Sequence, residues 1–173
     1  MSDRPGRVQR LTHVDEAGAA RMVDVSGKDV TVRTATASGR VLVSPEVVAL
    51  LRGGAVPKGD ALAVARIAGI QAAKRTPDLV PLCHPIAIHG VDVDLDVADD
   101  AVHVSATVRT ADRTGVEMEA LTCVAVAGLA LVDMVKAVDR AATITDVRVE
   151  HKSGGRSGEW RRTGSPAEPS AAP

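Results

Sequence analysis

Residues 91–108 constrain the fold more than any other part of the chain. From residue 91 to residue 97, valine or leucine alternates strictly with aspartate, and after Asp99 and Asp100 apolar residues alternate again at positions 102–108. Such alternation places every second side chain on the same face of a β-strand. A short polar turn between two alternating runs is typical of an antiparallel hairpin. We therefore predict a hairpin with one buried face and one acidic or polar face.

Helical and extended segments surround this hairpin. Three helices are predicted, from the N-cap Ser44 to Gly53, from the N-cap Asp60 to about residue 75, and over residues 116–138, a length of about 34 Å. Residues 31–43 predict a strand or a hairpin with a break at residues 38–39, and residues 143–149 predict a last strand. The order β-α-α-β-β-α-β contains the split β-α-β pattern. It predicts an α+β, ferredoxin-like sandwich in which helices cover one face of an antiparallel sheet.

The core of this sandwich has to be built almost without aromatic residues. The chain has no Phe, no Tyr and a single Trp160, whereas 27 valines and 28 alanines make up about a third of its 173 residues. Small side chains bury little area per contact, so we expect thin layers and close backbone approach. Oligomerisation would add buried area and is therefore favoured. Stacking of nucleic-acid bases on aromatic rings is unavailable.

Charge and cysteine content exclude several classes of protein. The formal net charge is −1, which argues against a nucleic-acid polymer or an anionic membrane as partner. The longest apolar run has ten residues, too few for a transmembrane helix. The two cysteines lie 40 residues apart, without the spacing of a disulfide scaffold or a four-cysteine zinc site. We expect a cytoplasmic protein with one domain over residues 11–160, a disordered N-terminus over 1–10 and a disordered polar tail over 161–173.

The segment from residue 77 to residue 85 contains three prolines and is predicted to be a stiff extended loop, not a helix. It carries Cys83 and His84. These could form a functional pair, or simply be a buried thiol beside a solvated imidazole. Because neighbouring extended side chains point to opposite faces, a Cys nucleophile with His84 as its base is disfavoured. No histidine spacing indicates a metal ligand set, and we expect no metal site.

Asp133 and Lys136 are the most suggestive charged pair, because they lie three residues apart in an otherwise apolar helical stretch. One interpretation is an ordinary helix ion pair of small energetic value. The other is a desolvated pair in which the pKa of Asp133 rises and that of Lys136 falls, so that both can transfer protons efficiently. Spacing alone leaves both interpretations open.

Three further segments could contact an anion or a nucleotide base. Glu117 and Glu119 open the same helix, where they could simply favour the helix dipole or hold an N–H–C–NH2 edge through paired hydrogen bonds. Lys58 precedes a helix start in a way that suits a phosphate, although the pattern is common. Lys74 ends a helix, where a cation is favourable in any case. Residues 152–159 are glycine-rich and basic and could be a flap or a tail.

Several of these segments together resemble one family, the cyclic pyranopterin monophosphate synthases, also called molybdenum cofactor biosynthesis protein C. The resemblance spans about residues 11–160 in order. Its matching stretches are residues 11–14, 22–26, 58–60, 65–76, 82–85, 114–122, 133–138 and 152–155.

The resemblance implies both a reaction and a set of residues. The substrate would be a cyclised dihydroguanosine triphosphate, and the products cyclic pyranopterin monophosphate and diphosphate. The family pattern implies no required cofactor, leaves open whether Mg²⁺ accompanies the triphosphate, and implies a ferredoxin-like fold in a hexamer built as a trimer of dimers. It makes Asp133 the main catalytic acid/base and Lys136 its partner. The implied substrate-binding residues are Leu82, Cys83, His84, Met118, Glu119, Lys58 and Lys74.

One spatial constraint follows from the predicted helix. Glu119 and Asp133 are 14 residues apart, or about 21 Å along a straight helix, which a single nucleotide can hardly bridge. We therefore infer a pocket shared between subunits. A non-catalytic nucleotide sensor on the same fold remains an alternative, although the presence of Asp133, Lys136 and Lys58 favours the enzyme. Release of diphosphate would separate the two.

Overall fold

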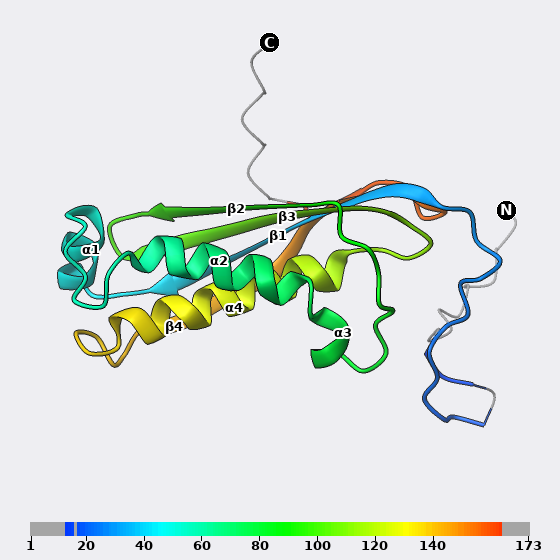
Figure 1. The fold of residues 1–173 in the computed structure, drawn as a ribbon, viewed down its shortest axis with the longest axis horizontal. Coiled ribbons are helices and arrows are strands. Elements are labelled where there is room, and N and C mark those ends of the chain that lie inside the picture. The colour runs from blue at the N-terminus through cyan, green and yellow to red at the C-terminus, as the bar shows by residue number, and fades with distance from the viewer. Residues whose placement is uncertain (1–12, 16, 164–173) are drawn as a thin grey trace, which may run out of the picture.

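A computed structural model describes residues 13–15 and 17–163. Its strands are β1 (Thr31–Leu42), β2 (Gly90–Val97), β3 (Ala101–Asp112), β4 (Thr143–Ser153) and β5 (Trp160–Arg161). Its helices are α1 (Pro45–Arg52), α2 (Ala61–Ala73), α3 (Thr76–Leu79) and α4 (Glu117–Val135). The strands form one antiparallel sheet in the order β2-β3-β1-β4-β5, and α2 and α4 pack together on one face of it (Figure 1). The α+β, ferredoxin-like prediction is confirmed, with β5 added at one edge.

The predicted hairpin is present as β2 and β3, with Val91 opposite Val108 and Val97 opposite Val102. Its buried face carries Val93, Val102, Val104 and Val108, each no more than 6 % exposed, whereas Asp92 and Asp94 on the other face are exposed. The strict alternation of the sequence thus corresponds to the two faces of the sheet.

The core is thin, as the missing aromatic residues predict. Leu131 is the largest of its fully buried side chains, most of which are valines. α2 and α4 approach closely, since a Cβ added at Gly69 would lie only 2.9 Å from the carbonyl oxygen of Cys123. Gly69 therefore lets one helix backbone rest directly on the other.

Four predicted boundaries differ from the structure. Residues 76–79 form α3, although the proline-rich segment was expected to contain no helix. Pro77 occupies one of the first helical positions, where no intrahelical N–H bond is needed. β1 runs unbroken through residues 38–39, and the irregularity there is a register shift in its pairing with β4. α4 ends at Val135, shorter than the predicted 116–138, and β4 extends four residues beyond the predicted 143–149.

Regular structure also continues past residue 160, where the polar tail was predicted to begin. Arg161 lies in β5, and the backbone N–H of Arg162 donates to the carbonyl oxygen of Glu150 at 2.8 Å. Residues 164–173 of that tail and the N-terminal segment 1–10 lie outside the described residues.

Within the described part of the chain, α4 is the one helix long and apolar enough to cross a membrane. More than half of that stretch, 56 %, is buried inside the domain. Its apolar residues contact α2 and strands β1, β3 and β4. Burial of this kind is typical of the core helix of a sandwich.

Candidate functional site

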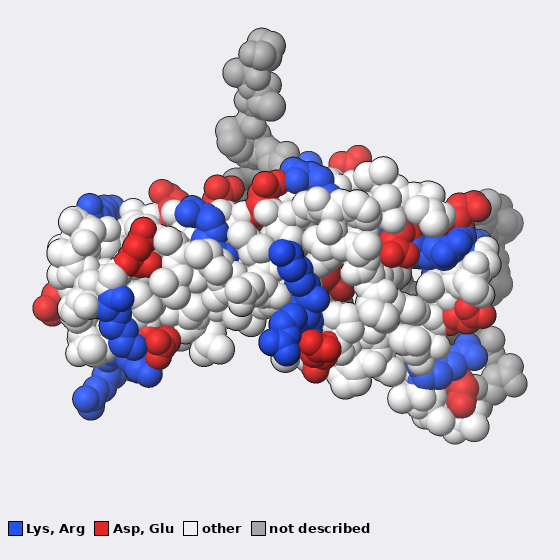
Figure 2. Space-filling view, in the orientation of Figure 1, with Lys and Arg blue, Asp and Glu red and all other residues white. Residues whose placement is uncertain are grey.

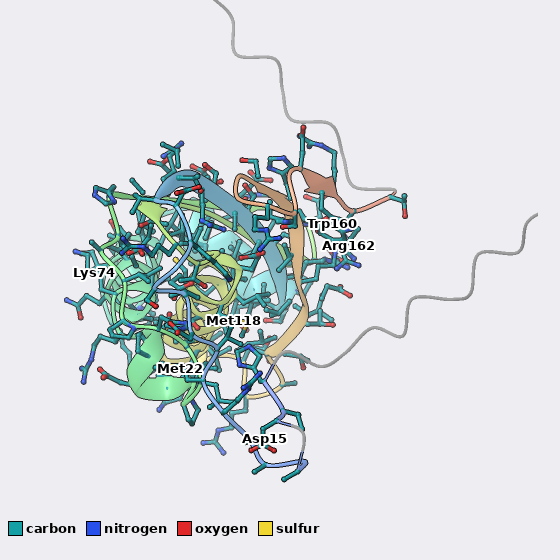
Figure 3. The ribbon with its side chains drawn as sticks, turned by 90° about the vertical axis from the view of Figure 1, so that its right-hand side faces the viewer. Asp15, Met22, Lys74, Met118, Trp160 and Arg162 are labelled. Atoms are coloured by element: carbon teal, nitrogen blue, oxygen red, sulfur yellow. The ribbon has the colours of Figure 1, made fainter. Side chains whose placement is uncertain are left out.

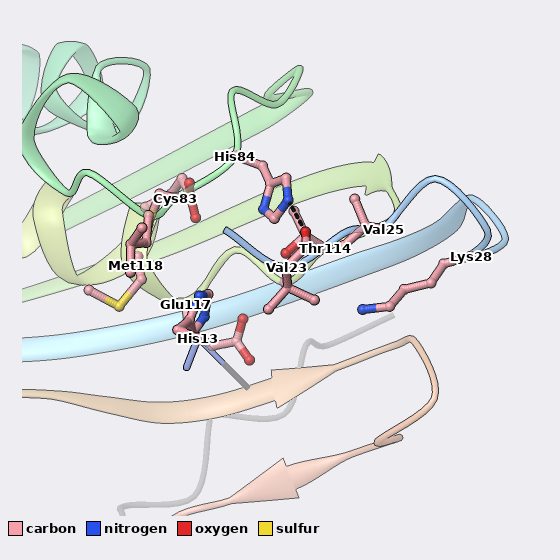
Figure 4. Close-up of a pocket in the computed structure, with 12 residues that line it drawn as sticks. His13, Val23, Val25, Lys28, Cys83, His84, Thr114, Glu117 and Met118 are labelled. Atoms are coloured by element: carbon pink, nitrogen blue, oxygen red, sulfur yellow. Dashed lines mark hydrogen bonds between the residues drawn. The ribbon is translucent and has the colours of Figure 1, made fainter. Parts of the chain in front are cut away.

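A cavity of about 410 Å³ lies at the N-terminal end of α4 (Figure 4). It brings together five of the predicted substrate-binding residues, which come from the loop after α3 and from the first turn of α4. These are Leu82, Cys83, His84, Met118 and Glu119. The geometry therefore supports a common site for them, while the role of each remains a prediction.

The loop that carries His84 is held against the N-terminal part of the chain. His84 Nε2 lies 2.7 Å from the carbonyl oxygen of Val23, so the imidazole donates to it (Figure 4). Val23 itself lines the cavity. The N-terminal segment and the proline-rich loop thus form adjoining walls of one site.

Glu119 is the most unusual group in this cavity, because it is only 3 % exposed. Burial, with a smaller contribution from the charge of Glu117, raises its pKa from 4.5 to about 7. A buried carboxyl with this pKa exchanges its proton near neutral pH. A glutamate that only interacted with the helix dipole would be solvated. The burial of Glu119 therefore needs a further explanation.

Cys83 lies beside this carboxyl, and its pKa is also raised. Burial is the larger cause, and the charge of Glu119 is the smaller one. A thiol with a raised pKa stays protonated at neutral pH and is a poor nucleophile. The structure thus agrees with the prediction that Cys83 and His84 are not a nucleophile and its base.

A second charged cluster lies at the opposite end of α4. Lys136 Nζ is 2.7 Å from Asp133 Oδ1, and Lys58 Nζ is 3.1 Å from Asp133 Oδ2. Lys58 Nζ also donates to the backbone carbonyl of Asp133 at 2.8 Å. Lys58 therefore belongs to the same cluster as the predicted catalytic pair, although it comes from the loop before α2.

Of the two interpretations of this pair, the single chain favours the exposed ion pair over the desolvated one. The side chain of Asp133 is 55 % exposed, and those of Lys136 and Lys58 are 58 % and 41 % exposed. Hydrogen bonds from Lys136 and then Lys58 lower the pKa of Asp133, opposite to the rise that the desolvated interpretation implies. Its adjacent apolar residues Met134 and Val135 do not cover Asp133, because they are buried on the inner side of α4.

Lys74 joins neither group. It is the exposed C-cap of α2, and it lines neither the cavity at the start of α4 nor the Asp133 cluster. Among the described residues, no group of three or more His, Cys, Asp or Glu side chains could hold a metal ion.

A second cavity, of about 440 Å³, adjoins the first through Lys28, which lines both. We call it the basic cavity. Its lining has three cations, Lys28, Arg33 and Arg156, and one carboxylate, Asp29, which gives a formal charge of +2. Arg33 is held in place by a 2.9 Å hydrogen bond from its Nε to the carbonyl oxygen of Asp112. Three cations around a hollow are suited to an anion.

Sequence reasoning missed Lys28, Arg33 and Arg156 as a group. They come from a loop, the start of β1 and the turn after β4, so no fixed spacing connects them. The only available signal was the glycine-rich, basic composition of residues 152–159.

Residues 22–155 match the MoaC family. The chain belongs to the MoaC family. Of the residues named above in the two cavities and the Asp133 cluster, this match contains all except Arg156.

Similar full-length proteins support this assignment. The chain is 76 % identical over 154 residues to the cyclic pyranopterin monophosphate synthase of Streptomyces coelicolor, covering 89 % of this chain and 91 % of that protein. It is 72 % identical over 165 residues to the cyclic pyranopterin monophosphate synthase of a Nocardioides species, covering 94 % and 99 %. It is 60 % identical over 156 residues to cyclic pyranopterin monophosphate synthase 2 of Mycobacterium tuberculosis, covering 90 % and 93 %.

Proposed function

We propose that this member of the MoaC family is a cyclic pyranopterin monophosphate synthase, a phosphorus–oxygen lyase of molybdenum cofactor biosynthesis. It would convert (8S)-3',8-cyclo-7,8-dihydroguanosine 5'-triphosphate into cyclic pyranopterin monophosphate and diphosphate. The observation that carries this proposal is the 76 % identity, over 89 % of the chain, to a protein of that name. The two adjoining cavities support a nucleotide-derived substrate, because one has a buried carboxyl and the other is basic.

The base of the substrate fits the cavity at the start of α4. A guanine-derived ring presents an N–H and an NH2 group side by side, and one carboxylate can accept from both. The burial of Glu119 in the cavity and its raised pKa support this role for it. Two donors from a ligand would offset its desolvation and favour its ionised form.

The triphosphate fits the basic cavity. Lys28 lines both cavities, so a ligand with its base near Glu119 could extend its phosphates toward Lys28, Arg33 and Arg156. Guanidinium groups are well suited to phosphate oxygens. We also propose that no resident cofactor is required and that any Mg²⁺ enters with the triphosphate.

The Asp133 cluster would carry out the proton-transfer steps. The two lysines keep Asp133 ionised, so it can accept a proton, while Lys136 can donate one as rings open and close. Lys58 adds positive charge where a phosphate is attacked intramolecularly and diphosphate leaves. Asp133 is thus the main acid/base of the proposal and Lys136 its partner.

The two ends of α4 would have to cooperate through a second subunit. α4 is continuous from Glu117 to Val135, so Glu119 and Asp133 remain about 21 Å apart along it. The outer face of α2 and α4 is largely uncharged (Figure 2) and exposes Val64, Ile67 and Leu129 by 42–60 %. Burial of such apolar area favours association. We propose a cytoplasmic homohexamer, a trimer of dimers, with each active site shared between two subunits.

Turnover tests the proposal directly. The purified protein is incubated with the cyclised triphosphate, and released diphosphate and the pterin product are measured. A synthase releases one diphosphate per product formed, whereas a nucleotide sensor binds the compound without releasing diphosphate. Binding without turnover by the wild-type protein would reject the enzymatic proposal.

A further inference from the structure

The turn between β4 and β5 lies directly on the start of β1. A Cβ added at Gly154 would collide with the carbonyl oxygen of Val32, and one added at Gly155 would collide with the guanidinium of Arg33. Both glycines have positive φ angles, 92° and 70°, which other residues adopt only with strain. The turn backbone therefore lies against Val32 and Arg33, and Arg156 lines the basic cavity together with Arg33.

A short hairpin carries this turn. β5 has two residues, and its pairing with β4 consists of His151 with Arg161 and Lys152 with Trp160. Two side-chain contacts close the hairpin across the turn. His151 Nε2 lies 3.0 Å from Glu159 Oε1, and Lys152 Nζ donates to Ser157 Oγ. Arg162 Nε also donates to the carbonyl oxygen of Val149 at 2.8 Å and lies 3.8 Å from Glu150 Oε2, at the open end of the hairpin. His151–Glu159 is thus the charged side-chain contact nearer the turn.

We propose that the His151–Glu159 contact is a latch that holds the β4–β5 turn closed over the basic cavity, so that Arg156 and the turn backbone complete the anion site. His151 and Glu159 are then positioning residues, since neither lines the cavity. This inference rests on the proposed function for the identity of the anion, the phosphates of the substrate. The latch itself can be measured with a simple anion.

The effect of Glu159→Ala on anion affinity distinguishes the latch from a purely electrostatic role of Glu159. Glu159 carries negative charge three residues from Arg156. If it acted only through its charge, Glu159→Ala would make the region more positive and strengthen anion binding. If Glu159 holds the turn closed, the same substitution weakens anion binding, because the turn must then be ordered when the anion binds.

The chain carries its own probe of this turn. Trp160 is its one tryptophan and there is no tyrosine, so protein fluorescence reports on β5 alone. Trp160 is 43 % exposed, and the Arg162 guanidinium lies 5.6 Å from its ring centroid (Figure 3). A change in the hairpin should therefore alter its emission and its quenching by acrylamide.

The experiment titrates the full-length protein with inorganic triphosphate and follows Trp160 emission. We expect saturable binding by the wild type. Glu159→Ala and His151→Ala should each weaken it about three- to fivefold, and the double variant should be no weaker than the worse single one. Glu159→Gln, which keeps a hydrogen-bond acceptor, should recover part of the affinity. Glu46→Ala is the control, because it removes the same charge from an exposed position in α1, outside the hairpin and the basic cavity, and should bind as the wild type does.

Turnover of the cyclised triphosphate then separates the latch from the proposed function. The latch variants should raise KM by the same factor and leave kcat unchanged. No turnover by the wild type, combined with latch-dependent triphosphate binding, would reject the proposed function alone. Wild-type or tighter binding by Glu159→Ala, or no binding of inorganic triphosphate by the wild type, would overturn the latch.

Discussion

Replacing Glu119 with glutamine should make the protein more stable at alkaline pH. Glutamine has nearly the same shape but cannot ionise, whereas Glu119 must ionise inside the domain above its pKa of about 7. The folded-state pKa is raised above the ordinary value of 4.5. The folded protein therefore retains a proton that the unfolded chain has lost, and the free energy of unfolding falls as pH rises from 4.5 through 7.

The magnitude follows from the two pKa values. The interval from 4.5 to about 7, at about 1.4 kcal/mol per pH unit, corresponds to about 3 kcal/mol. Little of this is lost to solvent screening, because Glu119 is only 3 % exposed. We therefore expect Glu119→Gln to be close to the wild type near pH 4.5 and more stable by about 3 kcal/mol at pH 8.5.

Urea denaturation at a series of pH values from 4.5 to 8.5 measures this difference. Glu46→Gln is a suitable control, since Glu46 is an exposed residue in the first turn of α1 and its substitution should shift stability equally across this pH range. The decisive quantity is the difference in free energy of unfolding between Glu119→Gln and the wild type, and how that difference changes with pH. A difference that stays constant from pH 4.5 to 8.5 would refute the argument that burial raises the pKa of Glu119.

Three further outcomes are expected. KM for the cyclised triphosphate should fall as pH rises through about 7, because the ionised Glu119 accepts both donors of the base; a pH-independent KM in the wild type would contradict this. Asp133→Asn should lower kcat by about 10²- to 10⁴-fold, and adding Lys136→Ala should cost little more. The side chains of Asp133 and Lys136 are more than half exposed, so the thermal midpoint of Asp133→Asn should barely differ from that of the wild type. Unaltered turnover by Asp133→Asn would remove Asp133 from the mechanism. Sedimentation should show an assembly larger than a dimer, and an active monomer would exclude the shared site.

The fold could be predicted because its signals are long and periodic. The β2–β3 alternation extends over two strands, and α4 has five helical turns of apolar sequence, so local ambiguity averages out. The four-residue α3 could not be predicted in this way. Its one turn depends on where Pro77 falls relative to the helix start, and a count of prolines does not contain that information.

The site was predictable only as separate pieces. The motif segments at residues 82–84 and 118–119 meet in one cavity, as the family resemblance implies. The basic cavity was not foreseen, because Lys28, Arg33 and Arg156 are brought together by the turn at Gly154 and Gly155. Spacing within a sequence cannot show contacts made by tertiary structure alone.

The exposure of Asp133 has a physical cause that bears on assembly. Apolar neighbours on a helix indicate burial only if they share a face, and Leu129, four residues earlier and therefore on the same face, is itself 60 % exposed. Asp133 and Leu129 thus lie on one outward stripe of α4 that the single chain leaves uncovered. A subunit that buried Leu129 would also reduce the solvation of Asp133, which would raise its pKa toward the range useful for proton transfer. A second subunit packed over the end of α4 would therefore both bury Leu129 and favour the proposed catalytic role of Asp133.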